Sequence, residues 1–220
     1  MNELIFLTQV ILISCSTLGA LYLGKEALIS LICLQCVLAN VFVLKEITLC
    51  GLTATGSDAF TVGIVLGLNL LQEYYGRDSA RKTIWLSFAL LIFYILVSTI
   101  HLYYIPAATD IMQAHYAALF GHMPRIMLAS LFVYLIVQLF DTALFARLNQ
   151  WFSGRYLVLR VIISLSISQF LDTVLFSYLG LYGIISNITH IIIVSYTIKL
   201  TSILLSSPFV ALTKMFKKPV

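Results

Sequence analysis

Long, nearly uninterrupted runs of apolar residues constrain the fold of this chain more than any other feature of its sequence. An α-helix needs about 20 such residues to cross the hydrocarbon core of a bilayer. The 220-residue chain contains seven runs of this kind, at 4–24, 27–47, 57–75, 83–105, 124–146, 158–181 and 184–210. The third is the weakest, because Gly56, Gly63 and Gly67 interrupt it. The sequence therefore predicts an all-α, polytopic transmembrane helical bundle with seven spans.

The composition supports the same class of protein. Hydrophobic residues make up 61% of the chain and charged residues only 10%, whereas charged residues are about 25% of an ordinary soluble domain. This excludes a soluble enzyme, a nucleic-acid-binding module and a disordered protein. The apolar runs are also too long and unbroken for the alternating strands of a transmembrane barrel. The lipid bilayer is thus an expected partner, and nucleic acid is not.

The positions of lysine and arginine predict how the chain is oriented. They cluster after the third run, after the fifth run and in the tail at 214–220: Arg77, Arg81, Lys82, Arg147, Arg155, Arg160, Lys214, Lys217 and Lys218. With all seven spans in place, these three regions lie on one side of the membrane. Basic residues are enriched in cytoplasmic loops. We therefore expect a cytoplasmic C-terminus, a basic cytoplasmic tail and an N-terminus on the outside.

A repeated polar motif lies inside the predicted spans. The fifth run contains QLFDTALF at 138–145, and the sixth contains QFLDTVLF at 169–176. The i, i+3 spacing puts Gln138 and Asp141 on one helix face, and Gln169 and Asp172 on another. Because consecutive spans run antiparallel, the same polar face is presented twice in opposite directions. Inverted repeats of this kind are typical of transporters that bind substrate near the repeat interface.

Other polar residues at membrane depth extend the candidate site. Lys199, in the middle of the seventh run, is the only basic residue deep enough to pair with Asp141 or Asp172, so we predict a Lys199–Asp ion pair. Asn40, Asn69 and Glu73 are further candidates. The alternative is that these polar groups only hold neighbouring helices together by hydrogen bonds. Asp58 is interpreted as a helix N-cap without a functional role.

The sequence contains no recognisable catalytic set. It lacks a nucleophile elbow, an HExxH motif and a phosphate-binding glycine loop. Its four histidines are too scattered to form a metal site. We therefore expect neither an enzyme nor a bound metal or cofactor.

Taken in order, several motifs resemble the queuosine precursor transporter family, also called the vitamin uptake transporter family. They are ANV at 39–41, QEYYG at 72–76, the two Gln-x-x-Asp-Thr-x-x-Phe octets, and Tyr196-x-x-Lys199 ahead of Pro208. The resemblance implies a six-span core at 27–213, with an additional N-terminal transmembrane helix at 1–26. It implies a multi-pass carrier of the bacterial inner membrane. Family members commonly have Asp where this chain has Asn69, which leaves the coupling ion open.

The resemblance implies a small-molecule, purine-like substrate for tRNA modification salvage: 7-cyano-7-deazaguanine, 7-aminomethyl-7-deazaguanine or queuine. A carboxylate can accept both N–H groups of a guanine-like edge, and a glutamine amide can donate to its carbonyl. Our hypothesis is that Asp141 and Asp172 divide two tasks, reading this edge and balancing a cationic amine, while Gln138 and Gln169 orient the ring. The assignment of tasks stays open.

Two other functions are compatible with the sequence. One is a substrate-capture subunit of an energy-coupling-factor transporter, which needs a separate ATPase. The other is a structural membrane protein whose polar pairs only join helices. A homodimer is compatible with each of these functions.

Overall fold

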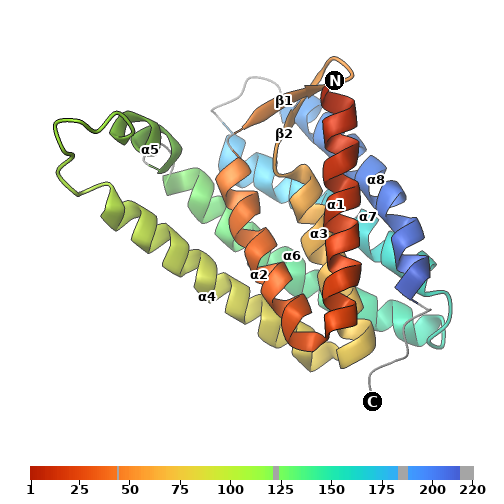
Figure 1. Ribbon diagram of the computed structural model, residues 1–220. Coiled ribbons are helices and arrows are strands. Elements are labelled where there is room, and N and C mark those ends of the chain that lie inside the picture. The colour runs from red at the N-terminus through yellow and green to blue at the C-terminus, as the bar shows by residue number, and fades with distance from the viewer. Residues whose placement is uncertain (44, 121–123, 183–187, 214–220) are drawn as a thin grey trace.

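The computed structural model describes residues 1–43, 45–120, 124–182 and 188–213, which are almost entirely α-helical (Figure 1). The helices are α1 (Asn2–Leu23), α2 (Lys25–Phe42), α3 (Asp58–Tyr75), α4 (Arg77–His101), α5 (Gln113–Phe120), α6 (Pro124–Trp151), α7 (Leu157–Phe176) and α8 (Ile188–Leu212). A π-helix, η1 (Ser177–Leu181), extends α7, and a hairpin joins β1 (Glu46–Leu49) to β2 (Leu52–Thr55). The predicted helical bundle is confirmed. The basic tail at 214–220 lies outside the described residues.

Six helices in the described part of the chain are long and apolar enough to cross a membrane. They are Asn2–Leu23, Lys25–Phe42, Arg77–His101, Leu128–Trp151, Leu157–Gly180 and Ile188–Leu212, and they coincide with six of the seven predicted runs. The remaining run, the third, forms α3, which does not meet this measure. Its polar residues, among them Asn69 and Gln72, lower its hydropathy.

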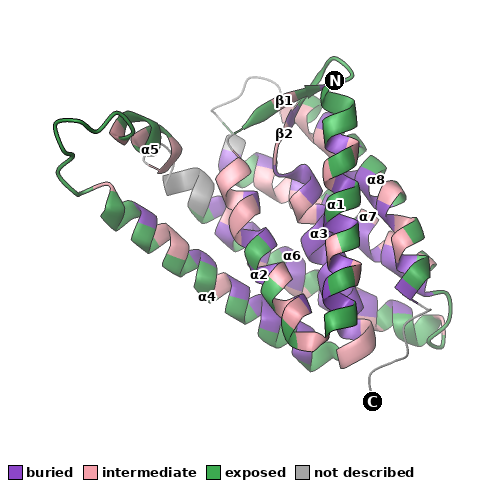
Figure 2. Ribbon diagram, viewed as in Figure 1, coloured by how far each residue is buried: buried purple, intermediate pink, exposed green. Residues whose placement is uncertain are grey.

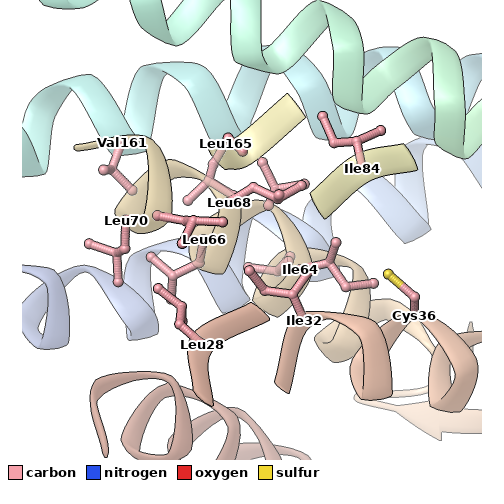
Figure 3. Close-up of a cluster of buried hydrophobic side chains, with 14 of the residues drawn as sticks. Leu28, Ile32, Cys36, Ile64, Leu66, Leu68, Leu70, Ile84, Val161 and Leu165 are labelled. Atoms are coloured by element: carbon pink, nitrogen blue, oxygen red, sulfur yellow. The ribbon is translucent and has the colours of Figure 1, made fainter. Parts of the chain in front are cut away.

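The position of α3 explains why it tolerates polar residues. It packs against α1, α2, α4, α6, α7 and α8 and therefore lies at the centre of the bundle. Most of its residues are buried (Figure 2). Figure 3 shows Leu66 and Leu68 of α3 between Leu28 of α2 and Leu165 of α7, in one continuous apolar core. A helix screened from lipid by its neighbours needs no apolar outer face.

Two glycines allow α1 and α2 to approach α3 closely. A Cβ added at Gly63 would lie 2.5 Å from Ile13 Cγ2 of α1 and 2.5 Å from Gln35 Oε1 of α2. One turn later, a Cβ at Gly67 would lie 2.8 Å from Ile32 Cγ1. Small residues spaced by four bring membrane helices into van der Waals contact along their backbones. The glycines that weaken α3 as an apolar run are thus required for its packing.

The β-hairpin lies at one end of the bundle, beside the N-terminus of α1 (Figure 1). Its two-residue turn, Cys50–Gly51, has positive φ at both positions, as the twist of a tight hairpin requires. Asn2 Nδ2 donates to Thr48 O at 3.0 Å, and Cys50 N donates to Glu3 Oε1 at 2.9 Å. The start of α1 therefore holds the hairpin in place. The α3–α4 and α6–α7 junctions lie at the opposite end.

Candidate functional site

A cavity of about 570 Å³, with polar and charged side chains in its wall, lies at the hairpin end of the bundle and is within the size range of ligand pockets. It is bounded by α2, the hairpin, the start of α3, α6, the end of α7 with η1, and α8. Its lining includes the exposed residues Glu46, Thr53 and His190, so the cavity reaches the surface on this side. Buried or half-buried polar groups line its interior.

An ion pair crosses the interior of the cavity from α8 to α7. Lys199, only 4% exposed, places its Nζ 2.6 Å from Asp172 Oδ2 and donates to Thr173 Oγ1 at 3.2 Å. A buried ammonium is tolerated only with such partners. The predicted Lys199–Asp ion pair is therefore present, and its carboxylate is Asp172. Both residues line the cavity, so the pair is positioned to contact a ligand.

Asp58 contributes a second buried carboxylate to the cavity wall. Its Oδ1 accepts a hydrogen bond from Thr55 Oγ1 at 3.1 Å, and Ser195 Oγ of α8 lies 3.3 and 3.4 Å from the two carboxylate oxygens. The N-cap of α3 is Ser57, and no side-chain cap bond is present. The interpretation of Asp58 as an N-cap is therefore wrong. Helix geometry does not explain why this carboxylate is buried.

The remaining lining provides an amide and aromatic rings. Asn40 is fixed from both sides, since its Nδ2 donates to Cys36 O at 3.0 Å and its Oδ1 accepts from Ser130 Oγ at 3.1 Å. Tyr134, whose hydroxyl is hydrogen-bonded to that of Ser87, and Phe176 at the end of α7 also face the cavity. Ring faces next to polar groups suit a planar heterocycle, which stacks on aromatic side chains.

The other half of the repeated motif lies away from the cavity. Asp141, 1% exposed, accepts hydrogen bonds through Oδ1 from Ser164 Oγ and Ser168 Oγ of α7, both at 2.6 Å. Gln138 and Gln169 are also buried, and Gln169 Nε2 donates to Thr61 O at 3.4 Å. None of these three residues lines the cavity. The structure thus brings Asn40, Asp172 and Lys199 together there, and leaves Gln138, Asp141 and Gln169 in the bundle core.

The two copies of the motif have the same hydrogen bond from threonine to backbone, but their phenylalanines lie in different surroundings. Thr142 Oγ1 donates to Gln138 O and Thr173 Oγ1 to Gln169 O, each at 2.8 Å. Phe176, in the second copy, lines the cavity. Its counterpart Phe145 is buried beneath the Arg160 guanidinium, 5.3 Å from its ring centroid. The end of the second copy therefore lies at the cavity, whereas the first copy lies in the bundle core and extends toward the opposite end.

Glu73 also lies far from the cavity, in a buried ion pair. Arg160 Nη1 and Nη2 donate to Glu73 Oε2 and Oε1 at 2.9 and 3.0 Å, and the Arg160 side chain is 0% exposed. Arg160 also donates to the backbone oxygens of Arg155 and Gly154. We counted Arg160 with the cytoplasmic loops, whereas it lies inside α7. Its position within the predicted apolar run 158–181 is the sequence feature that indicates a buried, paired charge.

Asn69 lies in the core, one turn before Gln72. Gln72 Nε2 donates to Thr142 O at 3.1 Å and so joins α3 to α6. Asn69 is fully buried, and neither end of its side-chain amide has a hydrogen-bond partner among the described residues. Asn69 is therefore a buried core residue of α3 and does not line the cavity.

Long apolar helices around a cavity, with a polar motif repeated on two consecutive helices and a buried ion pair, have features typical of a membrane carrier. Comparison with known proteins identifies the group. Residues 55–213 match the family described as "Putative vitamin uptake transporter". The chain is 35% identical over 189 residues to a protein of Bacillus subtilis (strain 168) named "Probable queuosine precursor transporter", covering 84% of this chain and 82% of that protein.

The chain belongs to this vitamin uptake transporter family, so it is a multi-pass membrane transporter and not an enzyme. No solved structure matches it. The family match includes α3 to α8 and begins at Thr55, just before Asp58.

Proposed function

We propose that this protein takes up a 7-deazaguanine precursor of queuosine for salvage into tRNA. The observation that carries the proposal is the cavity in which Lys199, Asp172 and Asp58 meet, a fixed cation with two carboxylates. The name of the Bacillus subtilis relative gives the substrate class. The proposed substrates are 7-cyano-7-deazaguanine, 7-aminomethyl-7-deazaguanine and queuine.

The lining groups complement the polar edge of such a base. That edge carries two adjacent N–H donors and a carbonyl acceptor. A carboxylate accepts both donors in bidentate fashion, and the Lys199 ammonium can donate to the carbonyl. Phe176 and Tyr134 line the cavity, and aromatic side chains of this kind can pack against the bicyclic plane. The cavity thus provides a donor, an acceptor pair and a stacking surface.

The position of Asp58 leads us to revise the division of tasks between carboxylates. Asp58 lines the cavity and Asp141 does not, so we propose Asp58 and Asp172, in place of Asp141 and Asp172, as the two carboxylates that divide the tasks. We propose that Asp172, held beside Lys199, reads the base edge and that Asp58 balances the amine of 7-aminomethyl-7-deazaguanine or queuine. Among the described residues, Asp58 accepts hydrogen bonds only from hydroxyl groups, and it shares the one cation nearby, Lys199, with Asp172, which Lys199 contacts directly. A cationic amine would balance the second carboxylate.

The distribution of basic residues also indicates how the protein is oriented in the membrane. The junctions that carry Arg77, Arg81, Lys82, Arg147 and Arg155 lie at the end opposite the hairpin. We propose that this end faces the cytoplasm of a bacterial cell and that the C-terminus is also cytoplasmic. The cavity then opens outward, as uptake requires. We further propose 27–213 as the transporter core and 1–26 as an additional helix.

The test is tRNA queuosine content in a bacterium that can neither make the precursor nor import it. Each of the three bases is supplied separately at limiting concentration. We expect the wild-type protein to restore queuosine with at least one base. Asp58→Asn should weaken rescue by the aminomethyl base more than by the nitrile, by roughly tenfold or more, because hydrogen bonds between charged groups contribute about 1.5–3 kcal/mol.

The matched control is Asp78→Asn, which removes an exposed carboxylate at the start of α4, far from the cavity. It should behave as wild type. Failure of all three bases to restore queuosine would contradict the proposed substrate class. Uptake by the purified protein in liposomes without an ATPase separates this function from that of an energy-coupling-factor subunit.

A further inference from the structure

Asp141 is an acidic group enclosed in the bundle without a cation. One of its oxygens, Oδ1, accepts two short hydrogen bonds, from Ser164 and Ser168. The other, Oδ2, is buried and has no hydrogen-bond partner among the described residues. An ionised carboxylate in such a place is costly unless a cation pairs with it. The neutral, protonated form avoids this cost.

No charged group next to α6 pairs with Asp141 among the described residues. The elements in most extensive contact with α6 are α3, α4, α7 and η1, and α2 also contacts it through Asn40 and Cys36. Within the described residues, none of the titratable side chains of these elements hydrogen-bonds to or forms an ion pair with Asp141: Lys25, Glu26, Cys33, Cys36, Asp58, Glu73, Tyr74, Tyr75, Arg77, Asp78, Arg81, Lys82, Tyr94, His101, Arg160, Asp172 and Tyr178. Arg160 pairs with Glu73, and Lys199 of α8 pairs with Asp172. Asp141 therefore has no cationic partner from these elements.

A protonated Asp141 also needs an acceptor for its O–H group. Gln138 lies one turn earlier on the same face of α6, and its Oε1 is buried without a partner among the described residues. Buried polar atoms are rarely left unpaired in native proteins. An unpaired acceptor on the same helix face as an unpaired carboxyl oxygen is a second sign that Asp141 carries a hydrogen.

The same site can also hold the ionised form for part of a cycle. Two hydroxyl donors on one oxygen stabilise a carboxylate. One of these donors, Ser168, lies one turn before Asp172 on α7. The helix that holds the cavity ion pair thus also holds Asp141, so a shift of α7 would act on both carboxylates together. Ionisable groups in membrane spans commonly serve as proton relays.

We propose that Asp141 is the proton-binding site that couples substrate uptake to the proton gradient. A proton from water on the hairpin side forms the O–H bond at Asp141 Oδ2. That bond breaks when the opposite side opens, and the proton passes to cytoplasmic water, so one proton enters with each substrate. Protonation of Asp141 favours the closed core described here, and loss of the proton favours a state that hydrates the carboxylate. This inference rests on the proposed transport function.

The test uses the purified full-length protein in liposomes, with labelled 7-cyano-7-deazaguanine as the probe. An inward proton gradient of about one pH unit should drive roughly tenfold accumulation at one proton per substrate. Asp141→Asn should abolish this accumulation but retain counterflow, the exchange of labelled for unlabelled base without a gradient. Three results would each overturn the proposal. They are accumulation by Asp141→Asn equal to that of wild type, accumulation driven by sodium alone, and loss of both counterflow and substrate binding in Asp141→Asn.

Two further measurements keep the inference testable if Asn distorts the core or if the probe is not a substrate. Ser168→Ala keeps the carboxyl group but removes a donor to the anion, so the pH profile of uptake should move to higher pH. Infrared spectra of the protein alone should contain a protonated-carboxyl band that is missing in Asp141→Asn. A wild-type protein that shows this band but transports no 7-deazaguanine refutes the proposed substrate and not the proton site. Absence of the band at neutral pH overturns the proton site itself.

Discussion

At the scale of single residues, the Lys199 ammonium is a buried cation in the cavity wall. It is almost fully buried, and its Asp172 partner is partly open to the cavity. A ligand whose edge carries N–H donors can therefore compete with Lys199 for Asp172 without unfolding the protein. The same geometry would also serve if the pair only joined α7 to α8, so a test must separate stability from transport.

Effects on stability and on transport can be separated by neutralising Asp172 alone and then Asp172 together with Lys199. Asp172→Asn leaves a buried, unpaired ammonium, and breaking a buried pair this way costs about 3–5 kcal/mol. We expect a lower melting temperature in detergent and loss of uptake. The double variant Asp172→Asn with Lys199→Met removes the unpaired charge, so it should recover most of the stability but no uptake. Uptake by the double variant at the wild-type rate would show that the pair is structural.

At the scale of elements, α3 combines polar residues with close packing against α1 and α2. Gly63 faces both α1 and α2, so a single methyl group there affects three helices. Overpacking a close-fitting core costs about 1–3 kcal/mol. We therefore expect Gly63→Ala to lower the thermal stability of the purified protein. The control is Gly19→Ala in α1, where an added Cβ meets nothing within 4 Å; equal melting temperatures for the two variants would contradict the role of Gly63.

The elements differ in how far the sequence predicts them. Apolar runs predict the long helices well, because length and hydropathy are local properties. The hairpin is missed, because its strands have four residues each and depend on Asn2 and Glu3, more than 40 positions away. The Lys199–Asp pair could be predicted, since Lys199 lies in the middle of a predicted apolar run, whereas Arg125 and Arg160 lie at the starts of theirs. The choice of Asp172, and the entry of Asp58 into the cavity, depend on how α3, α7 and α8 pack together.

At the scale of the whole molecule, polar groups are distributed unequally between the two ends. The hairpin end has the cavity, whereas Glu73 and Arg160 form a buried ion pair toward the opposite end, with the guanidinium over Phe145. Alternating access requires a transporter to open first at one end and then at the other. We expect this ion pair to break when the end opposite the cavity opens.

Weakening this contact should shift the protein toward the state that opens on the opposite side. Arg160→Lys keeps the charge but loses the two-pronged contact with Glu73, because lysine lacks the planar fork of arginine. The reporter is Ile191→Cys in a background without native cysteines, since Ile191 lines the cavity. In liposomes of known orientation, Arg160→Lys should slow its labelling by an impermeant thiol reagent from the hairpin side and speed it from the other side. Arg155→Lys, an exposed neighbour in the same junction, should leave both rates unchanged. If Arg160→Lys also leaves both rates unchanged, the ion pair is not a gate and closure of this end depends on the surrounding helix packing.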